Sequence, residues 1–453
     1  MDEHDAVPAT TAAFAANRQR RALTAGMASI LAWSFDLFDL FILLYVATTI
    51  APLFFPSKIA TLSLAAVYIG FAFTLLFRPL GAAIFGAYAD RRGRKWAMAV
   101  AVLGVGVATA LLGTLPTIAQ AGLVGPVLFF LLRMVQGIFV GGVVASTHTL
   151  GTESVSPRWR GLLSGLIGGG GAAIGGLLAS VIFLAVSSVF PGKTFGEWGW
   201  RVMFFSGLLS SLFSLLVFWL VEESPIWEDR ERSHRVDKTP LRTLLSSRYR
   251  GVFLLNLLVV FGSGATYYLT SGFLPTFLVA VNKLTRADSA VILIWANLGI
   301  IVAAPLFGHL SEMIGRRRTF LVAGVMNLVL VPIVYLSLGG YHGRPAFVPV
   351  LLLALALSFL GNAAYAPVLI FLNERFPTAI RSTGTGLSWN TGFALGGIMP
   401  AVVTVAAGKI TNLPVYLAAF VFAVTVVYLF GALVTPETRG HFEGDEVLTQ
   451  IQG

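Results

Sequence analysis

Long apolar runs, each separated from the next by a short polar stretch, follow one another from residue 24 to residue 434. Each run is about 20 residues or longer, which is the length that an α-helix needs to cross the hydrocarbon core of a bilayer. The pattern therefore predicts an all-α membrane protein with twelve transmembrane helices. The predicted spans are 24–50, 60–88, 96–114, 122–150, 159–187, 199–221, 250–281, 287–311, 319–338, 346–373, 382–408 and 411–434.

The amino-acid composition supports a chain that lies mostly in lipid. Of its 453 residues, 56% are hydrophobic and only 11% are charged, whereas a soluble protein carries about 25% charged residues. The chain has no cysteine, which excludes disulfides and thiol chemistry. Residues 1–23 lack the apolar core and the small-residue cleavage site of a secretory signal, so we expect no cleavable signal peptide.

Lysine and arginine residues are distributed unevenly between alternate loops. Of the 31 such residues, 22 lie in one set of loops and tails, seven lie in the other set, and Arg78 and Arg133 lie inside spans. Positive residues favour the cytoplasmic side of a membrane, so we expect both termini in the cytoplasm. Membrane topology thus accounts for the formal charge of +10, and we expect no binding to nucleic acid.

The longest polar stretch, at 222–249, divides the twelve spans into six and six. We expect it to be a cytoplasmic linker. The predicted organisation is a cytoplasmic tail over 1–23, a six-helix half over 24–221, this linker, a second six-helix half over 250–434 and a cytoplasmic tail over 435–453.

The two halves resemble each other in sequence. The loop around Asp90, between spans two and three, matches the loop around Glu312, between spans eight and nine, 222 residues later. Glu153 follows span four and Glu374 follows span ten, at an offset of 221 residues. Two motifs at nearly the same offset indicate an internal duplication. Parallel repeats of six spans with a site between them are typical of a transporter.

These repeated motifs predict a gate at the cytoplasmic side. An acid held against the next helix and a basic cluster can lock that side and release it when the halves rock. The alternative is that the basic residues only anchor the topology. The predicted gate residues are Gly86, Asp90, Arg91, Gly93, Arg94, Lys95, Glu153, Arg160, Gly308, Glu312, Gly315, Arg316, Glu374 and Arg381.

Four charged residues lie inside predicted spans of the first half. An ionised side chain at the bilayer centre costs roughly 2.5–3.5 kcal/mol. Four such groups in the first third of the chain therefore indicate one functional site. They are Asp36, Asp39, Arg78 and Arg133.

Asp36 and Asp39 are three residues apart and share one face of a helix. Two carboxylates this close repel each other and burial disfavours their charges, so one of them is suited to bind and release a proton. We expect both to couple transport to protons, with Asp39 as the titrating group and Asp36 paired with an arginine. The alternative is a permanent ion pair with Arg78 or Arg133 that only braces the helices.

Arg78 and Arg133 are expected to bind the substrate. A guanidinium group stays charged in any protein environment and can hold a carboxylate through two parallel hydrogen bonds. The alternative for each arginine is a buried salt bridge with no substrate contact.

The second half has a different chemistry inside its spans. The interiors of spans seven to twelve contain no Asp, Glu, Lys or Arg, but they hold amides and aromatic rings. We therefore expect ion chemistry in the first half and recognition of substrate shape in the second, with helix packing as the alternative. The predicted substrate-binding residues here are Tyr267, Tyr268, Asn297, Asn362, Tyr365, Trp389 and Asn390.

Gly161, Gly165 and Gly169 recur every four residues in span five. Small residues at this spacing let two helices approach closely in a membrane. The run therefore predicts a close helix–helix contact rather than a phosphate-binding loop.

The loop from Gly86 to Lys95, Gly-Ala-Tyr-Ala-Asp-Arg-Arg-Gly-Arg-Lys, resembles the signature loop of the Major Facilitator Superfamily. A finer resemblance over nearly the whole chain is to its metabolite:proton symporter branch, whose members carry shikimate, 2-oxoglutarate, citrate, or proline and betaine. The chain departs from that branch at Val143, where a glutamate is usual. Further matching motifs are Arg78-Pro-Leu-Gly81, Arg133-Met-Val-Gln136-Gly137 and Asn373-Glu-Arg-Phe-Pro-Thr378.

This resemblance implies two six-helix halves that rock around a central site. It implies a proton-coupled symporter in the plasma membrane, the inner membrane of a bacterium, that takes up a small organic acid such as a mono- or dicarboxylate. Three alternatives stay open: uptake of an aromatic acid or sialate, uptake of a zwitterion such as betaine or proline, and export by proton antiport. We expect a monomer in the bilayer, with no cofactor, no metal and no enzymatic activity.

Overall fold

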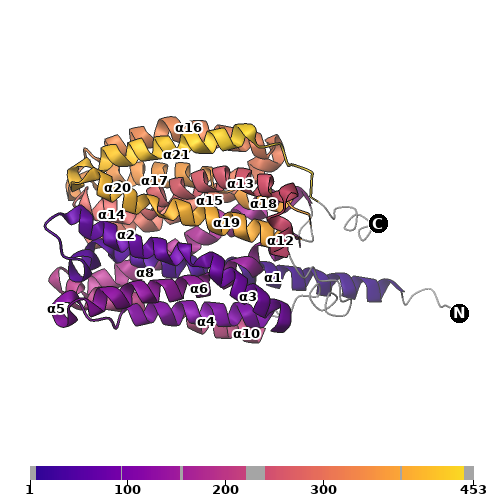
Figure 1. Ribbon diagram of the computed structural model, residues 1–453, viewed down its shortest axis with the longest axis horizontal. Helices are drawn as coiled ribbons and strands as arrows, with labels where there is room; N and C mark the ends of the chain where they lie inside the picture. Colours follow the sequence, from indigo (N-terminus) through magenta and orange to yellow (C-terminus); the bar gives the residue numbers. More distant parts are fainter. Residues whose placement is uncertain (1–6, 93, 154–156, 221–239, 378–379, 443–453) are drawn as a thin grey trace.

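A computed structural model describes residues 7–92, 94–153, 157–220, 240–377 and 380–442. The described chain is almost entirely helical, and its long helices run side by side along the longest axis of the molecule (Figure 1). The helices of the first half lie on one side of this bundle and those of the second half on the other. The fold is therefore a bundle of two halves with an interface along its length.

Helices of the first half account for spans one to six. The short 3-10 segment η1 precedes span five, the π-helical segment η2 interrupts that span, and the π-helical segment η3 precedes span six. The elements are α1 Val7–Phe54, α2 Ala60–Leu76, α3 Arg78–Arg92, α4 Arg94–Leu112, α5 Ile118–Ala121, α6 Val124–Glu153, η1 Pro157–Trp159, α7 Arg160–Gly165, η2 Leu166–Gly170, α8 Gly171–Val189, η3 Phe195–Gly199, α9 Trp200–Phe205 and α10 Leu208–Leu220.

Helices of the second half account for spans seven to twelve. The elements are α12 Pro240–Leu244, α13 Ser247–Tyr267, η4 Tyr268–Gly272, α14 Leu274–Ala280, α15 Arg286–Ile314, α16 Arg316–Leu338, η5 Arg344–Ala346, α17 Phe347–Ala363, α18 Val368–Glu374, α19 Arg381–Gly397, α20 Met399–Ala407, η6 Ile410–Asn412 and α21 Leu413–Val434.

The twelve predicted spans all coincide with helical segments. Among the described residues, ten segments are long and apolar enough to cross a membrane, and they match ten of the predictions. The third span holds a shorter apolar helix over Ala99–Leu112, and the sixth corresponds to α9 and α10. The predicted boundary between the halves, at 222–249, stays a prediction because most of it lies outside the described residues.

The largest difference in helix length concerns α1. The apolar pattern starts this span at residue 24, whereas the helix begins at Val7. The added turns are rich in alanine and arginine, which are strong helix formers. Helix formation needs only such residues, while a membrane span also needs apolar ones, so the apolar pattern detects the span and not the whole helix.

Proline residues accompany breaks inside several spans. The second span is interrupted at Phe77, between α2 and α3, just before Arg78 and Pro79. The tenth is interrupted between α17 and α18, where Pro367 precedes the second helix. Proline has no backbone N–H, so it fits the first turn of a helix, whereas in the interior it removes a backbone hydrogen bond. The first of these breaks places Arg78 at a helix start within the span.

The glycine run of span five forms a close contact between the halves, as predicted. A Cβ atom on Gly165 would lie 2.4 Å from the carbonyl oxygen of Ala304, and one on Gly161 would lie 2.4 Å from that of Gly308. Real Cβ atoms do not approach this closely, so α7 and α15 touch through their backbones.

Candidate functional site

An ion pair between Asp36 and Arg78 lies inside the bundle. Asp36 belongs to α1, and Arg78 begins α3 at the break in the second span. Asp36 Oδ2 and Arg78 Nη2 are 3.8 Å apart, and both side chains are buried. The predicted pairing of Asp36 with an arginine is thereby confirmed. Neither carboxylate oxygen of Asp36 accepts a hydrogen bond from the described residues, and Arg78 Nε donates none to them.

Asp39 has different neighbours from the paired aspartate one turn before it. A Cβ atom on Gly207 would lie 3.0 Å from Asp39 Oδ1, so the carboxylate packs against the backbone between α9 and α10. The hydroxyl groups of Thr109 and Ser210 lie beside it without forming a hydrogen bond of regular geometry. Its charged neighbours are the paired aspartate and Arg133.

Arg133 is held by a short chain of polar groups. Its Nη1 donates to Gln136 Oε1, and its Nε donates to the carbonyl of Gly70 over 3.4 Å. Gln136 Nε2 in turn donates to Thr109 Oγ1 over 2.7 Å. The Nη2 atom of Arg133 has no hydrogen-bond partner among the described residues. Gln136 is therefore a site residue that the sequence-based site prediction left out, and Arg133 keeps one donor available.

The four charges predicted inside the first half thus lie close enough to interact. Arg133 interacts with both Asp39 and Arg78, and Asp39 interacts with Asp36. Buried charges with unmet hydrogen-bonding capacity are costly, so such groups are kept where they bind protons or charged ligands. We call Asp36, Asp39, Arg78 and Arg133 the charge cluster. Its role in coupling and in substrate binding stays a prediction.

An aromatic cluster fills the facing part of the second half. The rings of Tyr267 and Tyr365 stack with their centroids 5.1 Å apart, and those of Trp389 and Phe393 stack at 4.3 Å. Tyr365 also meets the edge of Trp389 at 5.4 Å. All four side chains are buried. Tyr268 meets Tyr267 and Phe393 as well, so the structure brings together all four predicted aromatic residues and adds Phe393.

Aromatic residues of the first half complete this cluster. The prediction differs here, because it placed recognition of substrate shape in the second half alone. Three of the ring pairs that join the halves in the described part of the chain lie at this cluster, so the aromatic surface is shared rather than confined to the second half. The pairs are Trp33 with Trp389 at 6.1 Å, Phe41 with Tyr267 at 6.5 Å and Phe71 with Tyr268 at 5.1 Å between centroids.

A signal for two of these residues was present in the sequence. Trp33, Phe41 and Tyr45 are separated by multiples of four residues and therefore line one face of α1. Asp36 and Asp39 lie one turn away on the neighbouring face, and the site prediction for this helix rests on those two charges. An isolated ring such as Phe71 gives no such signal, because phenylalanine is common in every span.

The predicted asparagines differ in how much of the hydrogen-bonding capacity of their side-chain amides is used within the protein. Asn297 Nδ2 donates to Leu293 O over 2.8 Å and reaches Tyr45 and Ser180 of the other half over 3.3 Å. Asn362 Nδ2 donates to a hydroxyl and a carbonyl of its own half. The buried amide of Asn390 has no hydrogen-bond partner among the described residues. Asn390 thus has the most hydrogen-bonding capacity left for a ligand.

The charge cluster and the aromatic cluster adjoin each other. Arg78 lies close enough to Tyr267, Tyr268 and Tyr365 to interact with them electrostatically. Asp36 also lies within electrostatic range of Tyr268 and Tyr365. A guanidinium group therefore lies next to a set of aromatic faces. Such a junction can hold a small molecule that has an anionic group at one end and a cationic or apolar group at the other.

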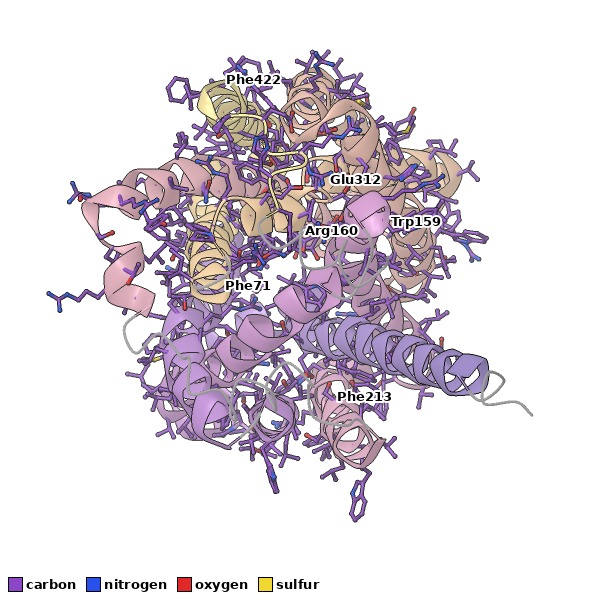
Figure 2. The ribbon with its side chains drawn as sticks, turned by 90° about the vertical axis from the view of Figure 1, so that its right-hand side faces the viewer. Phe71, Trp159, Arg160, Phe213, Glu312 and Phe422 are labelled. Atoms are coloured by element: carbon purple, nitrogen blue, oxygen red, sulfur yellow. The ribbon has the colours of Figure 1, made fainter. Side chains whose placement is uncertain are left out.

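One end of the bundle carries a second set of charges, which we call the tail end because α21 runs into residues 435–442 there. Arg316 donates to both carboxylate oxygens of Glu374, over 3.1 and 2.8 Å, and to Glu312 over 2.6 Å. Glu312 also accepts from the backbone N–H of Gly161, in the other half, over 2.7 Å. Figure 2 views this end, with Glu312 beside Arg160. Glu312 therefore joins the two halves, whereas Glu374 binds Arg316 within its own half.

Glu437, in the chain after α21, accepts hydrogen bonds from four backbone N–H groups. They include those of Arg316 and Arg317 at the start of α16. Burial raises the pKa of the Glu437 carboxyl, but these bonds outweigh it and hold the pKa below its usual range. Gly315, with φ of +97°, makes the turn before α16, and a Cβ there would lie 2.4 Å from Glu437 Oε2. Only glycine fits this position.

Phe442 also belongs to the tail-end contacts. The guanidinium groups of Arg160 and Arg381 each lie 4.0 Å from the centre of its ring. Arg160 comes from the first half and Arg381 from the second, so one buried ring touches both halves. Phe442 lies in the predicted tail 435–453 and is not among the predicted gate residues, because an isolated phenylalanine gives no local signal of such a contact.

Several predicted gate residues lie where side chains are not described. Gly93 itself falls outside the described residues, and its neighbours are described by their backbone only. The predictions for these positions are therefore untested. They are Gly86, Asp90, Arg91, Gly93, Arg94, Lys95 and Glu153.

With this geometry established, comparison with known proteins identifies the family. The sequence profile of the Major Facilitator Superfamily matches residues 37–399. The chain belongs to the Major Facilitator Superfamily. It is therefore a multi-pass membrane transporter of small molecules and not an enzyme, and the predicted twelve-helix fold of two six-helix halves is confirmed.

Curated relatives cover nearly the whole chain. The inner membrane metabolite transport protein YhjE of Escherichia coli is 31% identical over 423 residues, which are 91% of this chain and 94% of the relative. The proline/betaine transporter of Salmonella typhimurium is 25% identical over 432 residues, which are 92% and 84% of the two chains. A D-xylose–proton symporter has the same fold, with a TM-score of 0.69, 17% identity, and coverage of 93% of this chain and 99% of the symporter.

Proposed function

We propose that this transporter is a proton-coupled symporter that takes up a small zwitterion of the proline and glycine betaine class across the inner membrane of a bacterium. The proposal rests on the junction between buried guanidinium groups and aromatic rings. A zwitterion of this class offers a carboxylate to the former and a substituted ammonium to the latter. Relatives named for proline and betaine transport support this substrate class over the small organic acid expected from the sequence.

The two ends of such a substrate match the two clusters. A carboxylate binds a guanidinium through two parallel hydrogen bonds, and both Arg78 and Arg133 retain unused donors. A substituted ammonium ion is attracted to the faces of aromatic rings, by about 0.5–1 kcal/mol at exposed sites and about 2 kcal/mol when desolvated. Trp389, Tyr365 and Trp33 supply such rings, which suit best the quaternary ammonium of glycine betaine because it has no N–H group to donate.

Proton coupling uses Asp39 and its cationic neighbour Arg133. When both acids are ionised, Asp39 competes with the substrate carboxylate for Arg133, while Asp36 faces Arg78. A proton on Asp39 removes this negative charge, so that Arg133 is released to hold the substrate. Substrate and proton thereby favour each other's binding, which is what symport requires.

Alternating access uses the contacts at the two ends of the bundle. We infer that the tail end faces the cytoplasm, in agreement with the excess of positive residues in the loops there. At the opposite end, Tyr68 donates to Thr276 over 2.8 Å and Thr61 donates to the carbonyl of Gly408 over 2.9 Å, each between the halves. Breaking one set while keeping the other would open the central site to one side at a time.

Uptake into proteoliposomes tests this proposal. The purified transporter is reconstituted with an inward proton gradient and offered radiolabelled glycine betaine, proline, succinate and benzoate in turn. We expect accumulation of a zwitterion, and its loss when a protonophore collapses the gradient. Accumulation of succinate or benzoate in place of the zwitterions would contradict the proposal and show that the substrate is an organic acid. Zwitterion uptake that does not depend on the proton gradient would show that transport is not coupled to protons.

A further inference from the structure

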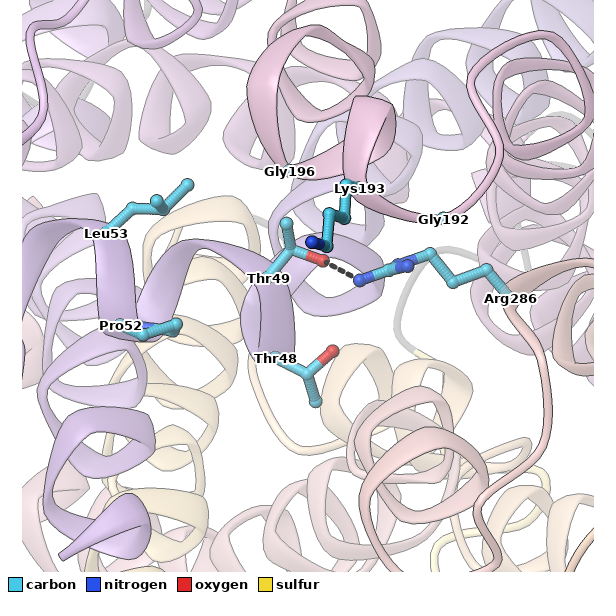
Figure 3. A pocket seen from close by; sticks show the side chains of 8 residues that line it. All are labelled: Thr48, Thr49, Pro52, Leu53, Gly192, Lys193, Gly196 and Arg286. Carbon is cyan, nitrogen blue, oxygen red and sulfur yellow. Dashed lines mark hydrogen bonds between the residues drawn. The ribbon is translucent and has the colours of Figure 1, made fainter.

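A separate pocket lies at the end of the bundle opposite the tail end, which we call the far end (Figure 3). Its volume is about 460 Å³, and its walls are the last turns of α1, the segment 192–196 and Arg286 at the start of α15. Small-molecule sites in proteins have volumes of roughly 300–1,000 Å³. Thr49 is thirteen residues after Asp36 on α1, which places this pocket about 20 Å from the charge cluster.

Two cationic side chains converge on this pocket. Figure 3 shows Lys193 and Arg286 pointing toward Thr49 from different elements. Neither forms an ion pair with an acid from the described part of the chain. The nearby acids in sequence are engaged elsewhere or exposed, because Asp288 accepts from the hydroxyl of the preceding helix cap over 2.8 Å and Glu197 lies on the surface.

Arg286 has donors that the protein does not use. Its Nη2 donates to Thr49 Oγ1 over 3.2 Å, and its guanidinium lies over the ring of Phe195 at 4.7 Å. Its Nε is buried and has no hydrogen-bond partner among the described residues. A planar guanidinium held by a ring face and a single weak hydroxyl contact is pre-oriented for a bidentate anion. The pocket therefore has the chemistry of a carboxylate site.

We propose that this pocket is an outer site that binds the carboxylate of the substrate before it reaches the central site. Arg286 holds the carboxylate through two N–H groups, and Lys193 adds a second positive charge. The proposal rests on the proposed function only in that the substrate carries a carboxylate. Arg286 belongs to the second half and Thr49 to the first, so a carboxylate that takes over the Arg286 donors also releases this contact between the halves.

The absence of native cysteine allows a direct test. A cysteine is introduced at Gly196, where an added Cβ meets no atom within 4 Å, or at Thr48 as a second reporter on another wall of the same pocket. Each is labelled with an anionic sulfonatoethyl and a cationic trimethylammonioethyl methanethiosulfonate. The sulfonate serves as a stand-in for the carboxylate. Local fields in charged clefts raise the concentration of the opposite ion by 10-fold or more.

We expect the ratio of anionic to cationic labelling rates to exceed that of a free thiol by about tenfold. The double substitution Lys193→Gln with Arg286→Gln should return the ratio to the free-thiol value. Lys58→Gln is the matched control, because Lys58 is an exposed lysine in the loop after α1 and does not line the pocket. A ratio equal to that of the free thiol at both reporters, or an equal loss in the Lys58→Gln control, would overturn the proposal.

Protection from labelling then tests for carboxylate recognition. Acetate and glycine betaine should slow the anionic reagent at Gly196→Cys, whereas choline, which has the same quaternary ammonium without the carboxylate, should not. Equal protection by choline would contradict the proposal. Because acetate is a probe independent of the transported solute, protection by acetate without betaine uptake in proteoliposomes would refute the proposed function while leaving the outer site in place.

Discussion

Asp36 and Asp39 are one helical turn apart on α1, yet their surroundings separate their roles. Asp36 faces the guanidinium of Arg78 at 3.8 Å. Asp39 lies against Gly207, with hydroxyl groups beside it and Arg133 as its cationic neighbour. A carboxylate already held by an arginine is less free to take a proton than one among hydroxyls. This difference favours Asp39 as the group that titrates during transport.

The substitution Asp39→Asn should abolish proton-driven accumulation while leaving the protein folded. The amide is nearly the same size as the carboxylate but cannot carry the proton. Substrate exchange across a membrane without a proton gradient should survive, because exchange needs only alternating access. Counterflow and gradient-driven uptake in the same proteoliposomes measure the two activities. Glu197→Gln, on the exposed surface, is the control, and wild-type accumulation in Asp39→Asn would exclude Asp39 from coupling.

Arg133→Lys should weaken substrate binding roughly tenfold or more. Lysine carries the charge but cannot contact Gln136, Gly70 and a carboxylate at once, and a hydrogen bond to a charged group is worth about 1.5–3 kcal/mol. Calorimetric titration of the purified variant measures the change. If the affinity for a carboxylate-bearing substrate is unchanged, Arg133 is only a structural brace.

At the scale of helices, two faces meet at the centre of the molecule. The face of α1 that carries Trp33 and Phe41 lies against α19 and α13, and the rings from both sides form one aromatic surface. Helices α7 and α15 meet nearer the tail end, where the glycines of α7 lie against backbone carbonyls of α15. The first contact provides chemistry for a ligand, and the second lets the halves close.

Trp389→Leu should reduce affinity for glycine betaine more than affinity for a carboxylate that lacks the ammonium. Leucine keeps an apolar surface but removes the aromatic face, and the loss of one desolvated cation–π contact of about 2 kcal/mol corresponds to roughly 30-fold. Competition against radiolabelled betaine measures both ligands. Trp295→Leu, at an exposed position of the same half, should have no effect. An equal effect of both substitutions would contradict recognition of the ammonium group by the ring of Trp389.

Gly308→Ala should hinder closure of the tail end. The new Cβ would lie 2.2 Å from the carbonyl oxygen of Gly161, so α7 and α15 would have to separate. Gly299→Ala in the same helix is the matched control, because its Cβ would make only an ordinary contact at 3.6 Å. Labelling of a cysteine placed near Gly161 should be faster in Gly308→Ala than in Gly299→Ala. Equal labelling would mean that the contact does not limit closure.

At the scale of the whole molecule, the tail-end contacts link elements distant in sequence. Arg316, Glu312 and Glu374 join three helices of the second half and reach Gly161 of the first. The tail after α21 adds Glu437, whose pKa lies below its ordinary value of 4.5. Its contribution to tail docking is therefore present above that value and is lost only as the pH falls through the lowered pKa. The contribution of Glu437 to tail docking is therefore fully present at neutral pH.

Phe442→Ala should favour opening at the tail end. Removing the ring eliminates the group that both Arg160 and Arg381 contact at 4.0 Å, and the two guanidinium groups would then face each other without it. Spin-label distances between the halves at this end should shift to longer values. His441→Ala, at the exposed neighbouring position, serves as the control. Unchanged distances would show that the tail only rests on the gate.

The sequence predicts the membrane fold well because insertion into lipid is decided span by span. Each apolar run has its own free energy of transfer into lipid, and its orientation depends on the positive residues in the adjacent loops. Both depend on local sequence and not on the packing of the rest of the chain. The duplication around Asp90 and Glu312 is likewise readable from the chain alone. The same local reasoning finds Asp36, Asp39, Arg78 and Arg133, since a charge in an apolar run is costly wherever the run lies.

Only the tertiary structure decided which groups meet. Asp36 could have paired with either arginine, and its position opposite the break at Phe77 selects Arg78. The contact of Trp33 with Trp389 joins residues more than 350 positions apart, and no local pattern encodes it. Sequence alone thus determined the spans, their repeat and the residues too charged for lipid, because these depend on local transfer energies. The partners of those residues depend on how the two halves pack.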